Sequence, residues 1–455
     1  DQKIKIYGHE KIAYNRVRTA TEIAPAYSRG LVEQFAITLP TEGKDGNVNV
    51  GLGRFYRNPE HKTQTNGFIA PTETFNSACT LKVAGLEIDV MPAPSDADDS
   101  VTYWFKSLGC AVNNLVWPVL FNVFAIRGEE YRDPRILLTG IDHLLSLSAK
   151  HLVGAHGMPI SGEQEIFERV TKYRDSIQFL WDQTVRLTNR GYTSVELAHS
   201  IRLPEFYDDD NLTSEFYGVA EHHVRQIRSG LLGWFDGDEA NLFPLPRIEH
   251  SDRMIAGFGG REKVRQQTRD AIDNDDLRWA CELGSWLVNS TDVENSDKML
   301  LSSVLRLIAQ RTTAANIRNW CLARARHLDE TFDLTRFNRH RVSKKQVIAS
   351  PVGNSLSALR VLLIPERATR VETHIAFNFS GHKMSGLHIR NCVAVPTNGV
   401  GAEIAVNCTP EIWADIISGD LKLSVAVETN ALTVTGDKYR ALEALQVFDV
   451  ENLQS

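Results

Sequence analysis

Two loops in the sequence carry residues suited to chemistry. His156 follows the apolar run at 150–155 and precedes Pro159, so we expect a strand whose end presents an imidazole from a loop into a cleft. Such a histidine can bind a metal ion, and a structural histidine is the alternative. In an earlier loop, Arg127 can offer paired hydrogen-bond donors to an oxyanion and Asn122 can add a neutral donor. The alternative for Arg127 is a surface salt bridge.

The composition indicates a multidomain globular protein. The 455 residues exceed one ordinary core, and 42% apolar with 24% charged residues is typical of folded chains. A net charge of -7 gives no general field that would hold nucleic acid, so we expect no nucleic-acid partner. The six cysteines are scattered without a C-x-x-C pair, which favours neither a zinc ribbon nor a disulfide scaffold. The longest apolar stretch, residues 115–126, is too short to span a bilayer.

Short strands and then long helices must position these loops. Alternating patterns predict strands at 4–7, 81–83, 86–90, 102–105 and 150–155. From Ser161 the apolar period changes to about 3.6, which predicts a long helix that begins with a capping box of Ser161 and Gln164 and stops at Gly191. A second capping box is expected from Thr193 and Glu196.

The rest of the chain divides into further helices and a small α+β domain. Helices are expected at 261–273, 276–288 and 297–310, and a basic linker at 329–345, for which a nucleic-acid patch is the alternative. The C-terminal elements are predicted as a helix at 355–363, strands at 371–379, 387–395 and 402–406, and a helix that starts at Thr409-Pro410 and ends at Gly419.

Several segments, in this order, resemble the alkyl sulfatase family of the metallo-β-lactamase superfamily. They are the run 122–128 with Arg132-Asp133, His156-Gly-Met-Pro159, residues 179–193, the segment 233–244, Gly259-Gly260 and residues 276–283. The C-terminal region resembles a sterol-carrier-protein-2-like (SCP2-like) module.

The resemblance implies a multidomain fold of α/β, all-α and α+β parts. Residues 1–160 would form the C-terminal part of a metallo-β-lactamase αββα sandwich, 161–330 a helical dimerisation domain, and 331–455 an SCP2-like domain that gathers long alkyl chains. It also implies a homodimer whose helical arms clasp the second subunit, and it points to the periplasm or to secretion.

The resemblance further implies a zinc site, with two zinc ions in the family and one or none possible here. The motif H-x-H-x-D-H, which supplies the early ligands, does not occur in this sequence, and residues 4–12 resemble the stretch that follows it, so we expect those ligands upstream of Asp1. His156 is the expected late ligand. Asp96 is the expected acidic ligand, with Asp98 and Asp99 as competitors and a solvated acidic loop as the alternative. Asn114 falls where the family places a bridging glutamate, and its neutral amide would weaken a second metal site.

The function implied is hydrolysis of alkyl sulfates by zinc-activated water. Arg127 and Asn122 would receive the sulfate head, and His222 would act as acid or donor, with His223 beside it as a competitor. Without the upstream ligands the chain is expected to be inert. Two alternatives remain: a metal-free dimer that binds hydrophobic molecules, and a metallohydrolase of the same fold that acts on another ester or thioester.

Overall fold

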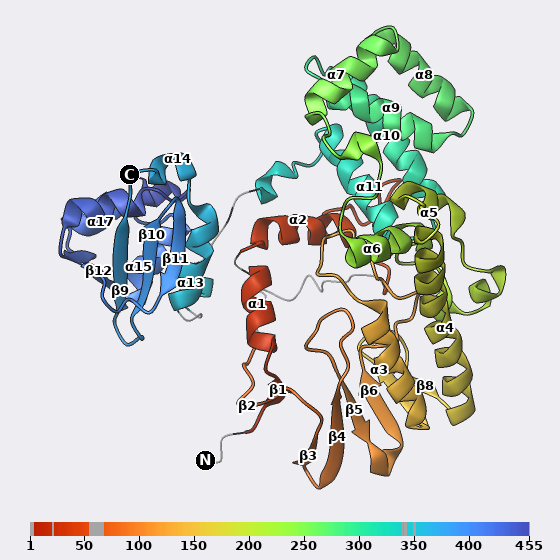
Figure 1. Cartoon of the computed structure of the whole chain (residues 1–455), viewed down its shortest axis with the longest axis horizontal. Coiled ribbons are helices and arrows are strands. Elements are labelled where there is room, and N and C mark those ends of the chain that lie inside the picture. The colour runs from red at the N-terminus through yellow and green to blue at the C-terminus, as the bar shows by residue number, and fades with distance from the viewer. Residues whose placement is uncertain are drawn as a thin grey trace. The chain divides into compact units, whose positions relative to one another are not determined.

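The protein divides into two compact units in the computed structural model (Figure 1). The described residues are 4–20, 22–53, 68–338, 340, 344–348 and 352–454. The units comprise residues 1–12 with 27–336 and residues 13–26 with 337–455. The domain boundary expected at 330/331 is near this division, whereas the one expected at 160/161 falls inside the larger unit, within strand β8 (Ile160–Ser161).

A six-stranded sheet forms one part of the larger unit. Its strands are paired in chain order and are β3 (Cys79–Val83), β4 (Leu86–Pro92), β5 (Val101–Phe105), β6 (Cys110–Asn113), β7 (His151–Gly154) and β8. Every neighbouring pair is antiparallel except β6 and β7, which are parallel and joined by helix α3 (Pro134–Ser146). A separate parallel pair joins β1 (Tyr7–His9) to β2 (Glu73–Phe75). The predicted sheet-bearing region is confirmed, and the sandwich architecture stays a prediction.

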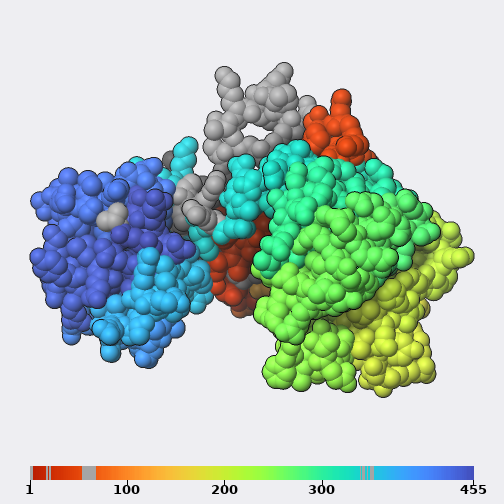
Figure 2. Space-filling view, turned by 90° about the horizontal axis from the view of Figure 1, so that it is seen from above, coloured from red at the N-terminus to blue at the C-terminus, as the bar shows by residue number. Residues whose placement is uncertain are grey.

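Helices form the remainder of the larger unit, as the sequence predicted. They include α2 (Ala24–Gln34), most of which belongs to this unit, and then α4 (Glu163–Thr188), α5 (Ser194–Ser200), α6 (Ala220–Leu232), α7 (Arg247–Gly257), α8 (Arg261–Asp273), α9 (Leu277–Val288), α10 (Asn295–Arg311) and α11 (Ala315–Leu328). In the space-filling view, the helices coloured green form a continuous part of the surface of this unit (Figure 2).

Two of the three predicted helix signals are confirmed. Thr193 and Glu196 form the reciprocal capping box of α5, and Gly191 takes a left-handed conformation, with φ +87°, just beyond α4. The capping box predicted from Ser161 and Gln164 is wrong. Ser161 belongs to β8, where its hydroxyl lies 2.9 Å from Nδ1 of His151 on the partner strand, so the hydroxyl is already engaged. Gly162 is the N-cap residue instead, without a side-chain hydrogen bond.

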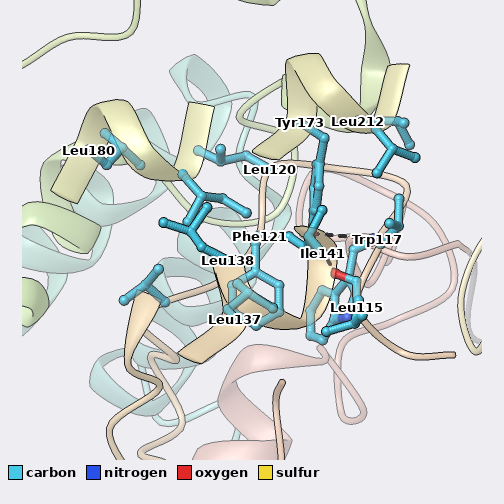
Figure 3. Close-up of a cluster of buried hydrophobic side chains, with 14 of the residues drawn as sticks. Leu115, Trp117, Leu120, Phe121, Leu137, Leu138, Ile141, Tyr173, Leu180 and Leu212 are labelled. Carbon is cyan, nitrogen blue, oxygen red and sulfur yellow. Dashed lines mark hydrogen bonds between the residues drawn. The ribbon is translucent and has the colours of Figure 1, made fainter. Parts of the chain in front are cut away.

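The main core of the larger unit lies between the sheet, α3 and α4. Tyr173 on α4 is fully buried, and its hydroxyl donates to the backbone oxygen of Leu115 over 3.1 Å and accepts from the backbone nitrogen of Trp117 over 3.3 Å (Figure 3). Apolar side chains of α3 and the 115–121 segment pack around this ring. The first long helix therefore fixes the loop that follows β6.

The smaller unit has its own sheet and core. The order β11 (Val393–Thr397), β10 (Ser385–Arg390), β9 (Thr373–Phe379), β12 (Ile404–Cys408) and β13 (Thr433–Thr435) describes its five-stranded sheet. Its helices are α1 (Ile12–Ala20), α12 (Lys344–Ile348), α13 (Val352–Leu359), α14 (Pro365–Ala368), α15 (Pro410–Ser418), α16 (Leu423–Glu428) and α17 (Lys438–Leu445). The predicted N-cap Thr409 and left-handed stop Gly419 of α15 are confirmed. Arg339 and Arg341 of the predicted linker lie outside the described residues.

Candidate functional site

Three loops meet at one edge of the six-stranded sheet. β4, β6 and β7 run in the same direction, because β4 and β6 are each antiparallel to β5 and β6 is parallel to β7. The segments that follow these strands therefore leave the sheet at the same edge. They carry Asp96, Asn114 and His156, which are the three metal-site residues predicted from the sequence.

The contacts at this edge connect the three residues. Nδ2 of Asn114 donates to Oδ1 of Asp96 over 2.5 Å, while Oδ1 of Asn114 is buried without a partner. The His156 ring stands edge-on to Trp117, with 5.1 Å between ring centroids. Burial lowers the pKa of His156, and the Asp96 carboxylate opposes that shift, so a neutral imidazole lies near a carboxylate.

These donors alone do not complete a zinc site. Across the described ranges, no group of three or more His, Cys, Asp or Glu side chains is placed to hold a metal ion. A catalytic zinc keeps an open position and takes three protein ligands, whereas this edge offers one imidazole and one carboxylate, with a neutral amide beside them. Of the competing carboxylates, Asp98 is bound by Nζ of Lys11 over 2.6 Å.

Arg127 is buried and does not form a surface salt bridge. Its side chain is 8% exposed, and Nη2 lies 3.1 Å from Oε2 of Glu129, which is 11% exposed. The guanidinium carbon lies 5.9 Å from the centroid of the Tyr27 ring and 6.0 Å from that of Phe35. A Cβ on Gly30 of α2 would lie 2.2 Å from the Arg127 carbonyl oxygen, so only glycine permits this approach. Within the part of the chain that the structure describes, Nε of Arg127 has no hydrogen-bond partner.

Arg132 is a second buried guanidinium, and it forms no ion pair with any described residue, although the carboxylates of Asp96 and Glu129 act electrostatically on its charge. Nη1 donates to the backbone oxygen of Asn122 over 2.6 Å, whereas Nε and Nη2 have no partner among the described residues. Burial lowers the pKa of Arg132, and the nearby positive charge of Arg127 lowers it further. Two cations this close, with free N–H groups, suit an anion that accepts from both. Arg132 was named from the sequence only as part of the segment that resembles the family, and it was not among the predicted site residues. In the sequence, the adjacent Asp133 suggests an ion-pair partner for Arg132, but in the structure Arg135 binds that carboxylate.

Asn122 and His223 add neutral donors to this group. Both polar atoms of the Asn122 amide and Nε2 of His223 are buried and find no partner among the described residues, and a Cβ on Gly218 would lie within 3.1 Å of both side chains. Nδ1 of His223 accepts the backbone N–H of Phe124 over 3.1 Å. Because burial lowers the pKa of His223 to about 3, the ring is neutral at pH 7 and carries its proton on Nε2. A hydrogen-bond donor therefore faces Asn122.

His222 takes a different position from its neighbour. Its ring stands edge-on to Phe124, with 5.4 Å between centroids, and burial lowers its pKa while Glu221 opposes the shift. The structure thus brings His223, and not His222, to Asn122 and Arg132. The resulting donor cluster consists of Asn122, Arg127, Arg132 and His223.

Buried donors without partners are rare in folded proteins, because each costs the free energy of its lost hydration. A group of them on four neighbouring residues indicates a ligand with several acceptor atoms and negative charge. The donor cluster can therefore bind an oxyanion, next to the Asp96 and His156 edge, whose residues interact electrostatically with Arg132 and with each other.

Comparison with known proteins identifies similar chains. Residues 193–331 match the alkyl sulfatase dimerisation family. A linear primary-alkylsulfatase of Pseudomonas sp. is 29% identical, with 99% of this chain and 87% of that protein covered. An (R)-specific secondary-alkylsulfatase of Pseudomonas sp. is 26% identical, with coverages of 98% and 68%. The solved structure of a stereoselective inverting sec-alkylsulfatase of Pseudomonas sp. superposes with a TM-score of 0.86 at 23% identity, covering 98% of this chain and 71% of that one, which establishes a shared fold.

Proposed function

We propose that the chain, which is similar to a linear primary-alkylsulfatase and whose residues 193–331 match the alkyl sulfatase dimerisation family, is a sulfuric ester hydrolase that cleaves alkyl sulfates. One observation supports this proposal most: the donor cluster, in which buried cationic and neutral N–H groups lack partners. An alkyl sulfate is a monoanion whose head group offers several acceptor oxygens and no proton. Because the sulfate oxygens only accept hydrogen bonds, they match a site that offers hydrogen-bond donors.

The residues of the cluster have separate tasks in this proposal. Arg132 contributes a charge that forms no ion pair among the described residues, and Arg127 contributes Nε while Glu129 balances part of its charge. Asn122 and His223 donate neutral hydrogen bonds that orient the head group. His222, the donor predicted from the sequence, would act from behind Phe124, so His223 is the better placed histidine. As the ester bond breaks, charge builds on the departing oxygens, and fixed donors stabilise it without reorganising.

Zinc as the activator of water is an expectation from the family. Zinc would supply a nucleophilic hydroxide at neutral pH. Asp96 and His156 would be its ligands from this chain, and these two side chains are too few to hold zinc without further donors. The chain's own residues bind, orient and surround the sulfate.

The homodimer and the SCP2-like module complete the proposal. The segment 232–248, within the region matching the dimerisation family, exposes large apolar side chains that a second subunit would cover, with exposed fractions of 62% for Leu232, 70% for Trp234 and 87% for Phe243. The smaller unit has an open cleft of about 460 Å³ in which polar residues such as Asn378 and Asn407 alternate with apolar ones such as Phe379, so its lining does not select for an alkyl chain. Among the described residues, no helix has the length and apolar character needed to cross a membrane.

Titration calorimetry with octyl sulfate and octanol tests the proposal on the full 455-residue chain. We expect octyl sulfate to bind and octanol, which has the same tail without the charge, to bind far more weakly. Equal binding of the two would refute recognition of the head group. Release of inorganic sulfate, measured with and without added zinc, then tests hydrolysis.

A second candidate function is a hydrophobe-binding protein without metal. The contact between Asn114 and Asp96 favours it, because an amide N–H occupies the carboxylate oxygen that a metal would need. Elemental analysis after dialysis against zinc separates the two candidates. Zinc retained in proportion to the chain supports the hydrolase, and octanol binding without zinc supports the second candidate.

A further inference from the structure

The Glu129 carboxylate is bound to the donor cluster through Arg127. Its Oε2 accepts from Nη2 of Arg127 over 3.1 Å and from the hydroxyl of Tyr27, on α2, over 3.4 Å. Its Oε1 accepts the backbone N–H of Glu130 over 3.2 Å. Both carboxylate oxygens therefore have donors, so the negative charge is held in one place. Because both side chains of the ion pair are largely buried, water and salt screen this charge little.

Glu129 also acts on the second arginine of the cluster. Burial and the positive charge of Arg127 lower the pKa of Arg132, whereas the negative charges of Asp96 and Glu129 oppose this shift. Glu129 is therefore close enough to both guanidinium groups to act on their charges. An anion that the two arginines bind would lie within the electrostatic reach of the same carboxylate. Asp96 acts on Arg132 in the same direction, so it restores no positive charge.

The charges of the donor cluster set how much negative charge it can balance. Arg127 and Arg132 carry positive charges, and the ion pair with Glu129 cancels one of them. The other two members are neutral, because Asn122 is an amide and burial lowers the pKa of His223 to about 3. A single positive charge therefore remains for a ligand. Its four members still offer N–H groups without partners among the described residues, so hydrogen-bonding capacity exceeds charge.

We propose that Glu129 makes the site selective for head groups with a single negative charge, because it cancels one of the two arginine charges. This inference rests on the proposed function and adds a specificity-determining residue to it. An alkyl sulfate carries one negative charge. An alkyl phosphate has a similar tetrahedral head group but carries about two negative charges at pH 8, since its second pKa is near 6. The second charge would have no positive partner in the cluster, and Glu129 would repel it.

Titration calorimetry with octyl sulfate and octyl phosphate at pH 8 tests the inference on the full chain. The quantity compared is the ratio of the two dissociation constants, in which any loss of binding-competent protein cancels. We expect the unsubstituted chain to prefer octyl sulfate by roughly tenfold or more. Glu129→Gln keeps the shape of the side chain and removes its charge. The preference should then fall by roughly tenfold, because the doubly charged ligand gains about twice as much electrostatic free energy as the singly charged one.

Two further variants separate charge from shape and from place. Glu129→Asp keeps the charge and should keep the preference for octyl sulfate. Asp45→Asn is the matched control, because Asp45 forms a comparably buried ion pair with Arg306 of α10 over 2.7 Å, with side chains 13% and 14% exposed. Removing that charge should leave the ratio unchanged. Melting temperatures, recorded for every variant, show that each is folded under the conditions of titration.

The outcomes distinguish the inference from the proposed function. An unchanged ratio in Glu129→Gln, an equal change in Asp45→Asn, or loss of the preference in Glu129→Asp would overturn the inference and leave the proposed function intact. Equal affinity of the unsubstituted chain for the two ligands would do the same. Absence of octyl sulfate binding by the unsubstituted chain would overturn both.

Discussion

Replacing Arg132 with methionine should separate binding from stability. The guanidinium is 5% exposed, donates one hydrogen bond to the Asn122 backbone and lies over the rings of Trp117 and Phe121 at 5.8 and 5.9 Å. Loss of these contacts costs about 1.5–3 kcal/mol for the charged hydrogen bond and about 0.5–2 kcal/mol for the rings. Removing a buried charge without a partner recovers several kcal/mol of desolvation. The free energy lost with these contacts and the desolvation free energy recovered nearly cancel.

We therefore expect Arg132→Met to change the free energy of unfolding by less than about 2 kcal/mol, while its affinity for octyl sulfate falls by about 30-fold or more. Chemical denaturation measures the first quantity and calorimetry the second. Octyl sulfate at a hundred times its dissociation constant should stabilise the unsubstituted chain by about 2.7 kcal/mol, and the variant by much less at the same concentration.

Arg169→Met is the matched control for this prediction. Arg169 is 27% exposed and binds Asp210 through two hydrogen bonds of 2.8 and 2.9 Å. Its loss leaves a partly buried carboxylate unpaired, so stability should fall by about 1–3 kcal/mol with binding unchanged. If Arg132→Met behaved like this control, Arg132 would be a structural residue and the reasoning on the donor cluster would be refuted.

Three further predictions concern other residues. Burial lowers the pKa of His223 to about 3, below the value of about 6.5 in the unfolded chain, so stability should be greatest above pH 6.5 and fall as the pH drops toward 3. His223→Gln should flatten that decline by up to about 1.4 kcal/mol per pH unit in denaturant titrations, and an unchanged slope would contradict the buried neutral ring. Asn114→Asp places a second carboxylate against Asp96 and should raise the zinc retained per chain in elemental analysis; equal zinc content would count against a metal at this edge. Thr193→Ala removes the cap of α5 and should cost about 1 kcal/mol in denaturant unfolding, whereas no loss would show that the capping box adds nothing.

Local patterns predicted most of the elements because their causes are local. Thr193, Gly191 and Thr409 each act within four residues, so the sequence shows both the signal and its target. The Ser161 cap failed for the opposite reason. Its hydroxyl is taken by His151, a partner made adjacent only by strand pairing. A rule based on neighbouring residues in the sequence cannot account for a hydrogen-bond partner that only the fold brings close.

The sequence suggested candidate site residues by chemical type and by resemblance, whereas their positions relative to one another follow from the fold. Arg127, Asn122 and His156 were identified by chemical type and by resemblance, and the strand directions then explain why the segments after β4, β6 and β7 meet. Arg132, named only within the segment that resembles the family, was not predicted as a site residue because the adjacent carboxylate, Asp133, suggests an ion-pair partner, whereas in the structure Asp133 binds Arg135. Whether a charged side chain such as Arg132 has an ion-pair partner depends on three-dimensional packing, so it cannot be predicted from the composition.

The helical region also supports the site from a distance in the sequence. Asn319 on α11 binds the backbone oxygens of Gln34 and Asn49 over 3.1 and 3.0 Å, and the backbone N–H of Asn316 donates to the oxygen of Tyr217 over 3.2 Å. The region that matches the dimerisation family thus holds α2, the 49–53 loop and the Tyr217 segment at once. Gln34 binds the backbone N–H of Arg127, and Tyr217 precedes Gly218, which lies against Asn122 and His223. The geometry of the site therefore depends on helices that contribute few groups to its chemistry. We expect a change in the packing of these helices to lower the affinity for an anion before it has other effects.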